Sequence, residues 1–89
     1  MAMADVAGTL EQIFNELMVG ETVPVRERTK LLCLTWDSLM QLNLVSAIEQ
    51  ECHVTFSDEE VIDLNSFASA RQMVEEKLLA NKTDDGNRV

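Results

Sequence analysis

The chain opens with apolar residues at helical spacing. Leu10, Ile13, Phe14 and Leu17 fall three or four positions apart, and Val6 lies one turn earlier. This spacing places them on one face of an amphipathic helix of about three turns. Gly20 follows and can end the helix, because glycine readily adopts the left-handed backbone found after helix C-termini.

The segment from residue 19 to 36 shows no clear period. It contains Pro24 and a charged run at 26–30, which predict a long loop. A loop of this length in a small domain is usually functional or disordered. We expect apolar side chains near its end to pin it to the core: Leu31, Leu32, Leu34 and Trp36.

A second helix begins near residue 37. Asp37 or Ser38 is a suitable N-cap, because either side chain can accept a hydrogen bond from a free backbone N–H of the first turn. The helix should run to about Glu51. Its predicted buried face consists of Leu42, Val45 and either Ile48 or Cys52.

Capping signals divide the rest of the chain. Ser57 and Glu60 form a capping box that starts a short third helix, after an extended link at 54–56. Asn65 or Ser66 can cap a fourth helix with the buried stripe Phe67, Ala70, Met73, Val74 and Leu78. We therefore predict an all-α fold with a single domain at 1–80 and a polar, disordered tail at 81–89.

Composition and charge limit the possible partners. A chain of 89 residues has room for one core, and a net charge of −9 disfavours nucleic acid and anionic membranes. No apolar run approaches the roughly 18 residues of a membrane span, and the N-terminus lacks a basic region, so we expect a cytoplasmic monomer. Basic partners should approach the stretch 31–70, which has no Lys or Arg and seven acidic residues: Asp37, Glu49, Glu51, Asp58, Glu59, Glu60 and Asp63.

The residues offer little for catalysis or metal binding. Ser38 as a nucleophile would need a nearby base, but the single histidine, His53, lies about 22 Å further along the same helix. Cys33 and Cys52 form no metal or redox motif, and the carboxylates lack the glycine-centred spacing of a calcium loop. We therefore predict no enzymatic activity and no metal site.

A longer pattern surrounds Ser38. The run Asp37-Ser38-Leu39 continues with Leu42, Leu44-Val45, Ala47-Ile48-Glu49, Glu51, Phe56, Asp58-Glu59-Glu60 and Leu64-Asn65-Ser66-Phe67. Over residues 36–79 the chain resembles acyl carrier proteins without a gap. The resemblance implies a four-helix bundle with a long loop between the first two helices and a short third helix. It also implies that Ser38 carries a covalent 4'-phosphopantetheine arm from coenzyme A, with an acyl or aminoacyl thioester at its end.

The same resemblance implies a set of partners. A phosphopantetheinyl transferase would attach the arm, an acyl-loading ligase or acyltransferase would load it, and enzymes of fatty acid or polyketide biosynthesis would use the cargo. The residues expected to meet these partners are Asp37, Leu39, Met40, Asn43, Glu49 and Ile62.

Several residues depart from the family's pattern. Trp36 stands where the family commonly has a small residue, which indicates a specialised carrier, and we interpret Trp36 as a core anchor more than a cargo contact. Cys52 occupies a position that is usually aromatic and should be buried. The family often has acidic residues along the second helix where this chain has Met40, Asn43 and Gln50. The acidic face is therefore thinner and more apolar.

Simpler interpretations stay open. Ser38 can be a capping residue alone, and Met40 can be either a partly exposed partner contact or a partly covered side chain. The alternative function is an acidic helical adaptor that binds partners without a covalent arm. Replacing Ser38 by alanine separates the two functions, because an adaptor scarcely depends on that hydroxyl.

Overall fold

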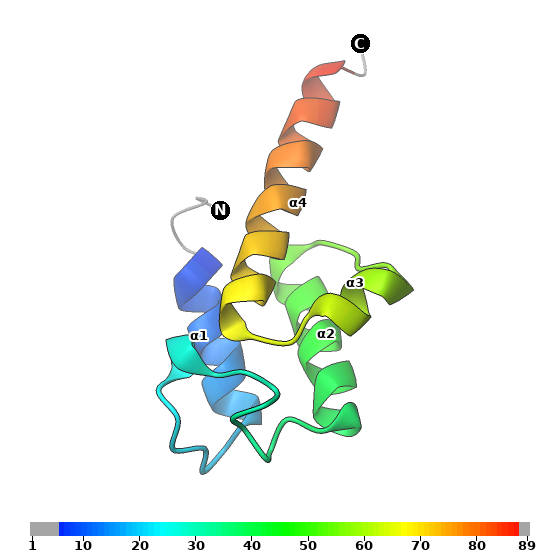
Figure 1. The fold of residues 1–89 in the computed structure, drawn as a ribbon. Helices are drawn as coiled ribbons and strands as arrows, with labels where there is room; N and C mark the ends of the chain where they lie inside the picture. The colour runs from blue at the N-terminus through cyan, green and yellow to red at the C-terminus, as the bar shows by residue number, and fades with distance from the viewer. Residues whose placement is uncertain (1–5, 88–89) are drawn as a thin grey trace.

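The computed structural model describes residues 6–87, with side chains described up to residue 80. In this part of the chain four α-helices form without any strand, as predicted. A single 3-10 turn, η2, interrupts the loop between the first two helices (Figure 1). The bounds are α1 Val6–Leu17, η2 Val25–Glu27, α2 Ser38–Cys52, α3 Asp58–Asp63 and α4 Phe67–Asn87.

Helix α1 packs its predicted apolar face into the centre of the molecule. Leu10 and Phe14 are fully buried, and the Phe14 ring meets Trp36 and Phe67 edge to face, with centroids 5.4 and 5.2 Å apart. Such aromatic pairs stabilise a core beyond the area they bury. This cluster joins α1 to the end of the long loop and to the start of α4, so the prediction of Trp36 as a core anchor is confirmed.

The long loop is attached to the bundle by polar contacts. The Arg28 side chain is buried, and its guanidinium donates to the carbonyl oxygens of Val23 and Phe14 at 2.8 and 3.2 Å. The Phe14 oxygen lies in the last turn of α1 and also accepts from Met18 N at 2.9 Å. The negative end of the helix dipole favours a cation at this position. An isolated antiparallel bridge between Thr29 and Ser66 then ties the loop to the segment before α4.

The prediction that leucines pin this loop was wrong. Leu31 is 93% exposed and Leu34 is 97% exposed, and Leu32 is also exposed. The loop is held by Cys33 and Trp36, which are both buried. Backbone hydrogen bonds from Cys33 N to Thr29 O and from Trp36 N to Cys33 O close two tight turns, and these turns direct the leucines outward.

The buried face of α2 also differs from the prediction. Val45, Ile48 and Cys52 are buried as expected, but Leu42 is 62% exposed. The buried face runs instead through Gln41, Leu44, Val45, Ile48 and Cys52. The predicted and observed buried faces therefore differ at the start of the helix, where Gln41 is buried in place of Leu42. Leucines occur on both the buried and the exposed side of this part of α2, so their spacing does not show which side is buried.

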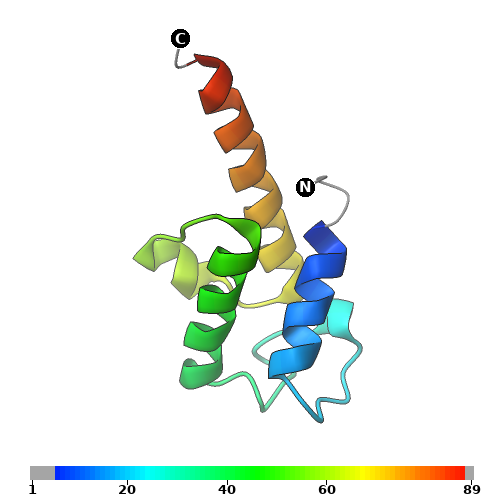
Figure 2. The same ribbon diagram turned by 180° about the vertical axis from the view of Figure 1, so that it is seen from behind.

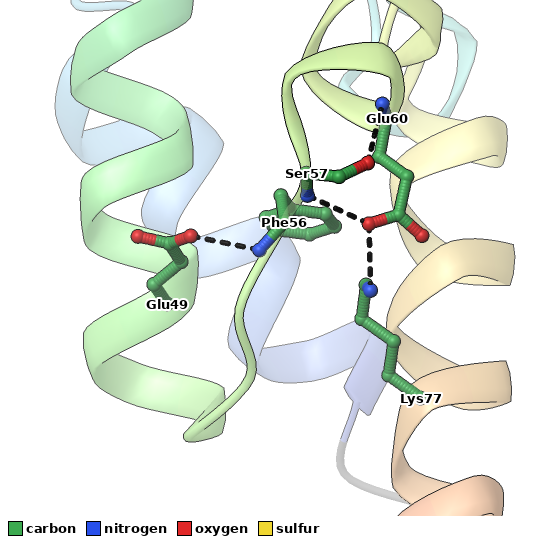
Figure 3. A network of polar contacts seen from close by, with 5 residues as sticks. All are labelled: Glu49, Phe56, Ser57, Glu60 and Lys77. Atoms are coloured by element: carbon green, nitrogen blue, oxygen red, sulfur yellow. Dashed lines mark hydrogen bonds and ion pairs between the residues drawn. The ribbon is translucent and has the colours of Figure 1, made fainter.

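The other end of α2 is joined to α3 and α4 by a polar network (Figure 3). The Glu49 carboxylate accepts a hydrogen bond from Phe56 N at 2.9 Å, which fixes the extended link after α2. The predicted capping box of α3 is present, since Ser57 Oγ accepts from Glu60 N and the Glu60 carboxylate accepts from Ser57 N. Lys77 of α4 donates to the same carboxylate at 2.8 Å.

Helix α4 begins as predicted but ends later. Ser66 Oγ accepts a hydrogen bond from Ser69 N at 3.0 Å, and the stripe from Phe67 to Val74 lies in the core. The backbone stays helical to Asn87, whereas the sequence predicted a disordered tail from residue 81; residues 88–89 lie outside the described part. In two opposite views α4 projects beyond the other helices, on the side away from the long loop (Figures 1 and 2).

Candidate functional site

The candidate site lies where the long loop enters α2. Asp37 is the N-cap, and its carboxylate accepts a hydrogen bond from Met40 N at 2.9 Å. Ser38 is therefore the first helical residue and not the cap, and its side chain is exposed. The free N–H groups and the positive end of the helix dipole favour a negative group at this position.

A groove of about 310 Å³ adjoins Ser38. It lies between the first turns of α2, the C-terminal half of α3 and the loop, and its walls are mainly apolar. Ile62, which was expected to meet partners, is 73% exposed and lines this groove together with Ser38. The lining residues are Lys30, Ser38, Gln41, Leu42, Val61 and Ile62.

Gln41 forms the polar floor of this groove. Its side chain is only 6% exposed and is hydrogen-bonded at both ends of the amide. The Oε1 atom accepts from Trp36 Nε1 at 2.6 Å, and Nε2 donates to the carbonyl oxygens of Val61 and Leu64 at 2.5 and 2.9 Å. One side chain thus connects the loop before Ser38 to the end of α3.

Exposed apolar side chains are frequent around the site. Leu39 is exposed beside Ser38, as expected of a partner contact. Large apolar side chains are also exposed on the loop, on α2 and on α3, and exposed apolar side chains mark an interaction site where they form a contiguous patch. The set is Leu31, Leu32, Leu34, Leu39, Leu42 and Ile62.

The remaining predicted partner residues are placed differently. Asn43 is exposed on α2, while Met40 is half-buried and packs against the core, so its covered alternative is the better description. Glu49 is not brought together with Ser38: it lies about 16 Å further along α2 and holds Phe56 N. The structure therefore gives Glu49 a role in joining α2 to α3.

The carboxyl group of Glu21 and the thiols of both cysteines have shifted pKa values. Hydrogen bonds from the Thr35 hydroxyl, at 2.7 Å, and from Val23 N lower the pKa of Glu21. Burial, and then the charge of Glu21, raise the pKa of the Cys33 thiol. Burial likewise raises the pKa of Cys52, which is buried as predicted. Both cysteines are therefore protonated and weakly nucleophilic near neutral pH.

The groups available for other chemistry are separated. Ser38 begins α2 and His53 follows its last residue, so the two residues stand at opposite ends of the helix. Among the described residues no three His, Cys, Asp or Glu side chains come together as a metal site would require. No helix in the same part of the chain is both long enough and apolar enough to cross a membrane.

Sequence reasoning missed four residues of the groove: Lys30, Gln41, Leu42 and Val61. Leu42 was assigned to the core and Gln41 received no role, although Leu42 follows Ser38 by one helical turn. A glutamine three residues after Ser38, flanked by apolar neighbours, was a usable signal. Lys30 offered no signal, because only the folded loop brings it to the groove.

Neither models of known protein families nor curated protein sequences yielded a match to this chain.

Proposed function

We propose that this protein is a carrier that holds an acyl or aminoacyl group as a thioester on a 4'-phosphopantetheine arm attached to Ser38. The observation that carries the proposal is the setting of Ser38. Its side chain is exposed at the capped start of α2, beside a groove with apolar walls. The likeness of residues 36–79 to acyl carrier proteins supplies the identity of the attached group.

The site suits the attachment reaction. The Ser38 hydroxyl oxygen forms a bond to the phosphorus that bears the pantetheine group of coenzyme A, and the pyrophosphate P–O bond breaks. Adenosine 3',5'-bisphosphate leaves, and a base on the transferase takes the hydroxyl proton. The product is a phosphodiester whose negative charge lies at the positive end of α2.

The surface around Ser38 suits a protein partner. Exposed leucines from the loop and from α2 lie close to Ser38 in the chain, and Asp37 adjoins it. Apolar contacts supply binding energy, while acidic groups favour partners with basic surfaces. A phosphopantetheinyl transferase, a loading ligase or acyltransferase, and downstream biosynthetic enzymes would share this surface, and in this proposal they act in the cytoplasm on a monomeric carrier.

The test is the intact mass of the purified protein before and after incubation with coenzyme A and a broad-specificity phosphopantetheinyl transferase. Ser38→Ala is compared with Ser46→Ala, which removes another exposed hydroxyl of the same helix. We expect one phosphopantetheinyl group on the native chain and on Ser46→Ala, and none on Ser38→Ala. Addition to Ser38→Ala, or no addition to any of the three, would contradict the proposal.

The second candidate is an adaptor without an arm. It is favoured by the leucines of the loop, because Leu31 and Leu34 are almost completely exposed and do not stabilise the fold. An adaptor would bind its partner equally well with Ser38 replaced by alanine. Leu31→Ala combined with Leu34→Ala would weaken that binding.

A further inference from the structure

The groove beside Ser38 ends at a polar barrier. Two of its walls are apolar and come from Leu42 on α2 and from Val61 and Ile62 on α3. The aromatic cluster of Phe14, Trp36 and Phe67 lies in the core and does not line the groove. Gln41 stands between the groove and this cluster, because it lines the first and accepts a hydrogen bond from Trp36 Nε1 at 2.6 Å in the second.

Passage through this barrier would disrupt three hydrogen bonds of Gln41, two of them buried and one part-buried. An alkyl chain that entered the core from the groove would have to displace the Gln41 amide. The indole N–H of Trp36 and the carbonyl oxygen of Leu64 would then lose their partner, and the Val61 carbonyl oxygen would keep only its 3.3 Å hydrogen bond from Leu64 N. A hydrocarbon cannot replace those bonds, and buried polar groups without partners are strongly unfavourable.

We propose that Gln41 excludes the cargo from the core, so that the carrier serves short or polar acyl groups that stay at the surface. The inference rests on the proposed function, since the excluded group is carried by Ser38. A long alkyl chain would lie at most in the open groove, with much of its surface still in water, which is unfavourable in proportion to the apolar area exposed. A short or polar group exposes little apolar surface and needs no internal cavity. Gln41 is in this view a specificity residue that acts by keeping the core closed.

The experiment uses the full chain and two donors, acetyl-coenzyme A and octanoyl-coenzyme A. A broad-specificity phosphopantetheinyl transferase moves the whole acyl-phosphopantetheine group to the Ser38 oxygen, with adenosine 3',5'-bisphosphate leaving as before. Intact mass establishes that each group is attached. The readouts are the melting temperature and the Trp36 fluorescence of the two loaded forms.

For the native chain we expect melting temperatures that differ by less than about 1 °C between the acetyl and octanoyl forms, and identical fluorescence. Burial of a long chain in the core would raise the melting temperature by several degrees. A higher melting temperature of the octanoyl form, with a changed Trp36 emission, would overturn the inference. This comparison needs no variant, so it holds even where a substitution at Gln41 prevents folding.

A substitution at Gln41 tests whether this side chain is what keeps the alkyl chain out of the core. Gln41→Met keeps the length of the side chain but replaces its amide with an apolar, flexible end. We expect the octanoyl form of this variant to melt several degrees above its acetyl form. Gln50→Met makes the same replacement at an exposed position of α2 and should behave like the native chain. Equal melting temperatures for the two forms of Gln41→Met would show that Gln41 is not the barrier.

The two proposals fail in different ways. If neither donor adds mass to the native chain, the proposed function fails, and the inference falls with it. If both groups attach but the octanoyl chain stabilises the native protein, Ser38 is a carrier site and only the exclusion by Gln41 is wrong.

Discussion

The two halves of α2 differ in how they distribute polar and apolar residues. In the C-terminal half Ile48 and Cys52 are buried and Gln50 is exposed, as in an ordinary amphipathic helix. In the N-terminal half this pattern is inverted over residues 38–42, where Gln41 is buried while Leu39 and Leu42 are exposed, before Leu44 returns to the core. The inverted half is the one that begins with Ser38.

This difference separates the residues that stabilise the fold from those available to partners. Exposed leucines contribute little to stability, and a buried amide is acceptable only when it is fully hydrogen-bonded, as Gln41 is. Stability alone would favour leucine at the position of Gln41 and polar residues at those of Leu39 and Leu42. The inverted pattern is what the proposed partner surface around Ser38 would require.

The largest expected effect comes from shortening a buried side chain in the C-terminal half of α2. Ile48→Ala should lower the free energy of unfolding by about 2–5 kcal/mol, because it leaves a cavity at a fully buried position. The matched change in the inverted half, Leu42→Ala, should alter it by no more than about 0.5 kcal/mol. Urea denaturation followed by circular dichroism measures both. A similar loss for the two variants would remove the distinction between the halves.

Removal of the buried amide should have the next largest effect. Gln41→Ala leaves Trp36 Nε1 and the Leu64 carbonyl oxygen without a partner and removes one of the two hydrogen bonds to Val61 O, so we expect a loss of about 1–3 kcal/mol. Trp36 fluorescence should shift in the folded state as well. Gln50→Ala on the exposed face is the control and should be nearly neutral. If both variants matched the native protein in urea denaturation, the hydrogen bonds of Gln41 would have no structural role.

Much of the fold was predictable because local signals agreed with the packing. The capping box at Ser57 and Glu60, the apolar face of α1 and the stripe of α4 are properties of short stretches, and all three are present. The inverted half of α2 could not be found in this way. Leu39 and Leu42 have the same apolar character as the buried Leu44, and only their surroundings in the fold distinguish them.

The candidate site was predictable at its centre and not at its edges. Asp37, Ser38 and Leu39 are contiguous, and they were predicted because a longer pattern of apolar residues, capping signals and acidic residues follows them along the chain. The groove also depends on Lys30 and Val61, which are distant in sequence and meet only after folding, whereas Ile62 was expected there through the family resemblance. The exposed loop leucines were assigned to the core because apolar character alone does not indicate direction; the turns at Cys33 and Trp36 decide it.

Loss of the cap should have a smaller effect, confined to the inverted half. Asp37→Ala removes the acceptor of the hydrogen bond from Met40 N, and we expect a loss of about 1 kcal/mol. Asp37→Asn keeps an acceptor and should recover most of it. Hydrogen exchange of the first-turn amides of α2 would locate the change. Faster exchange spread evenly over the whole helix would argue against a cap effect.

The smallest expected effect is the dependence of stability on pH at the polar network near the C-terminal end of α2, where Lys77 donates to Glu60. The hydrogen bond from Lys77, followed by that from Ser57 N, lowers the pKa of Glu60 below its ordinary value of 4.5. Its contribution to stability is therefore present above pH 4.5 and is lost as the pH falls through the lower value of the folded state. The difference in unfolding midpoint between the native chain and Glu60→Gln should shrink as the pH falls below 4.5. A difference that stayed constant would show that the carboxylate charge is unimportant there.

The most direct test of the carrier assignment is the position of the arm in protein isolated from its own cells. Cleavage after lysine and arginine releases residues 31–71 as one peptide that contains all five serines: Ser38, Ser46, Ser57, Ser66 and Ser69. Fragmentation of that peptide by tandem mass spectrometry identifies the modified residue. We predict a phosphopantetheinyl group on Ser38 alone. The same group on another serine, or a peptide unmodified in cells and after treatment with the transferase, would contradict the assignment.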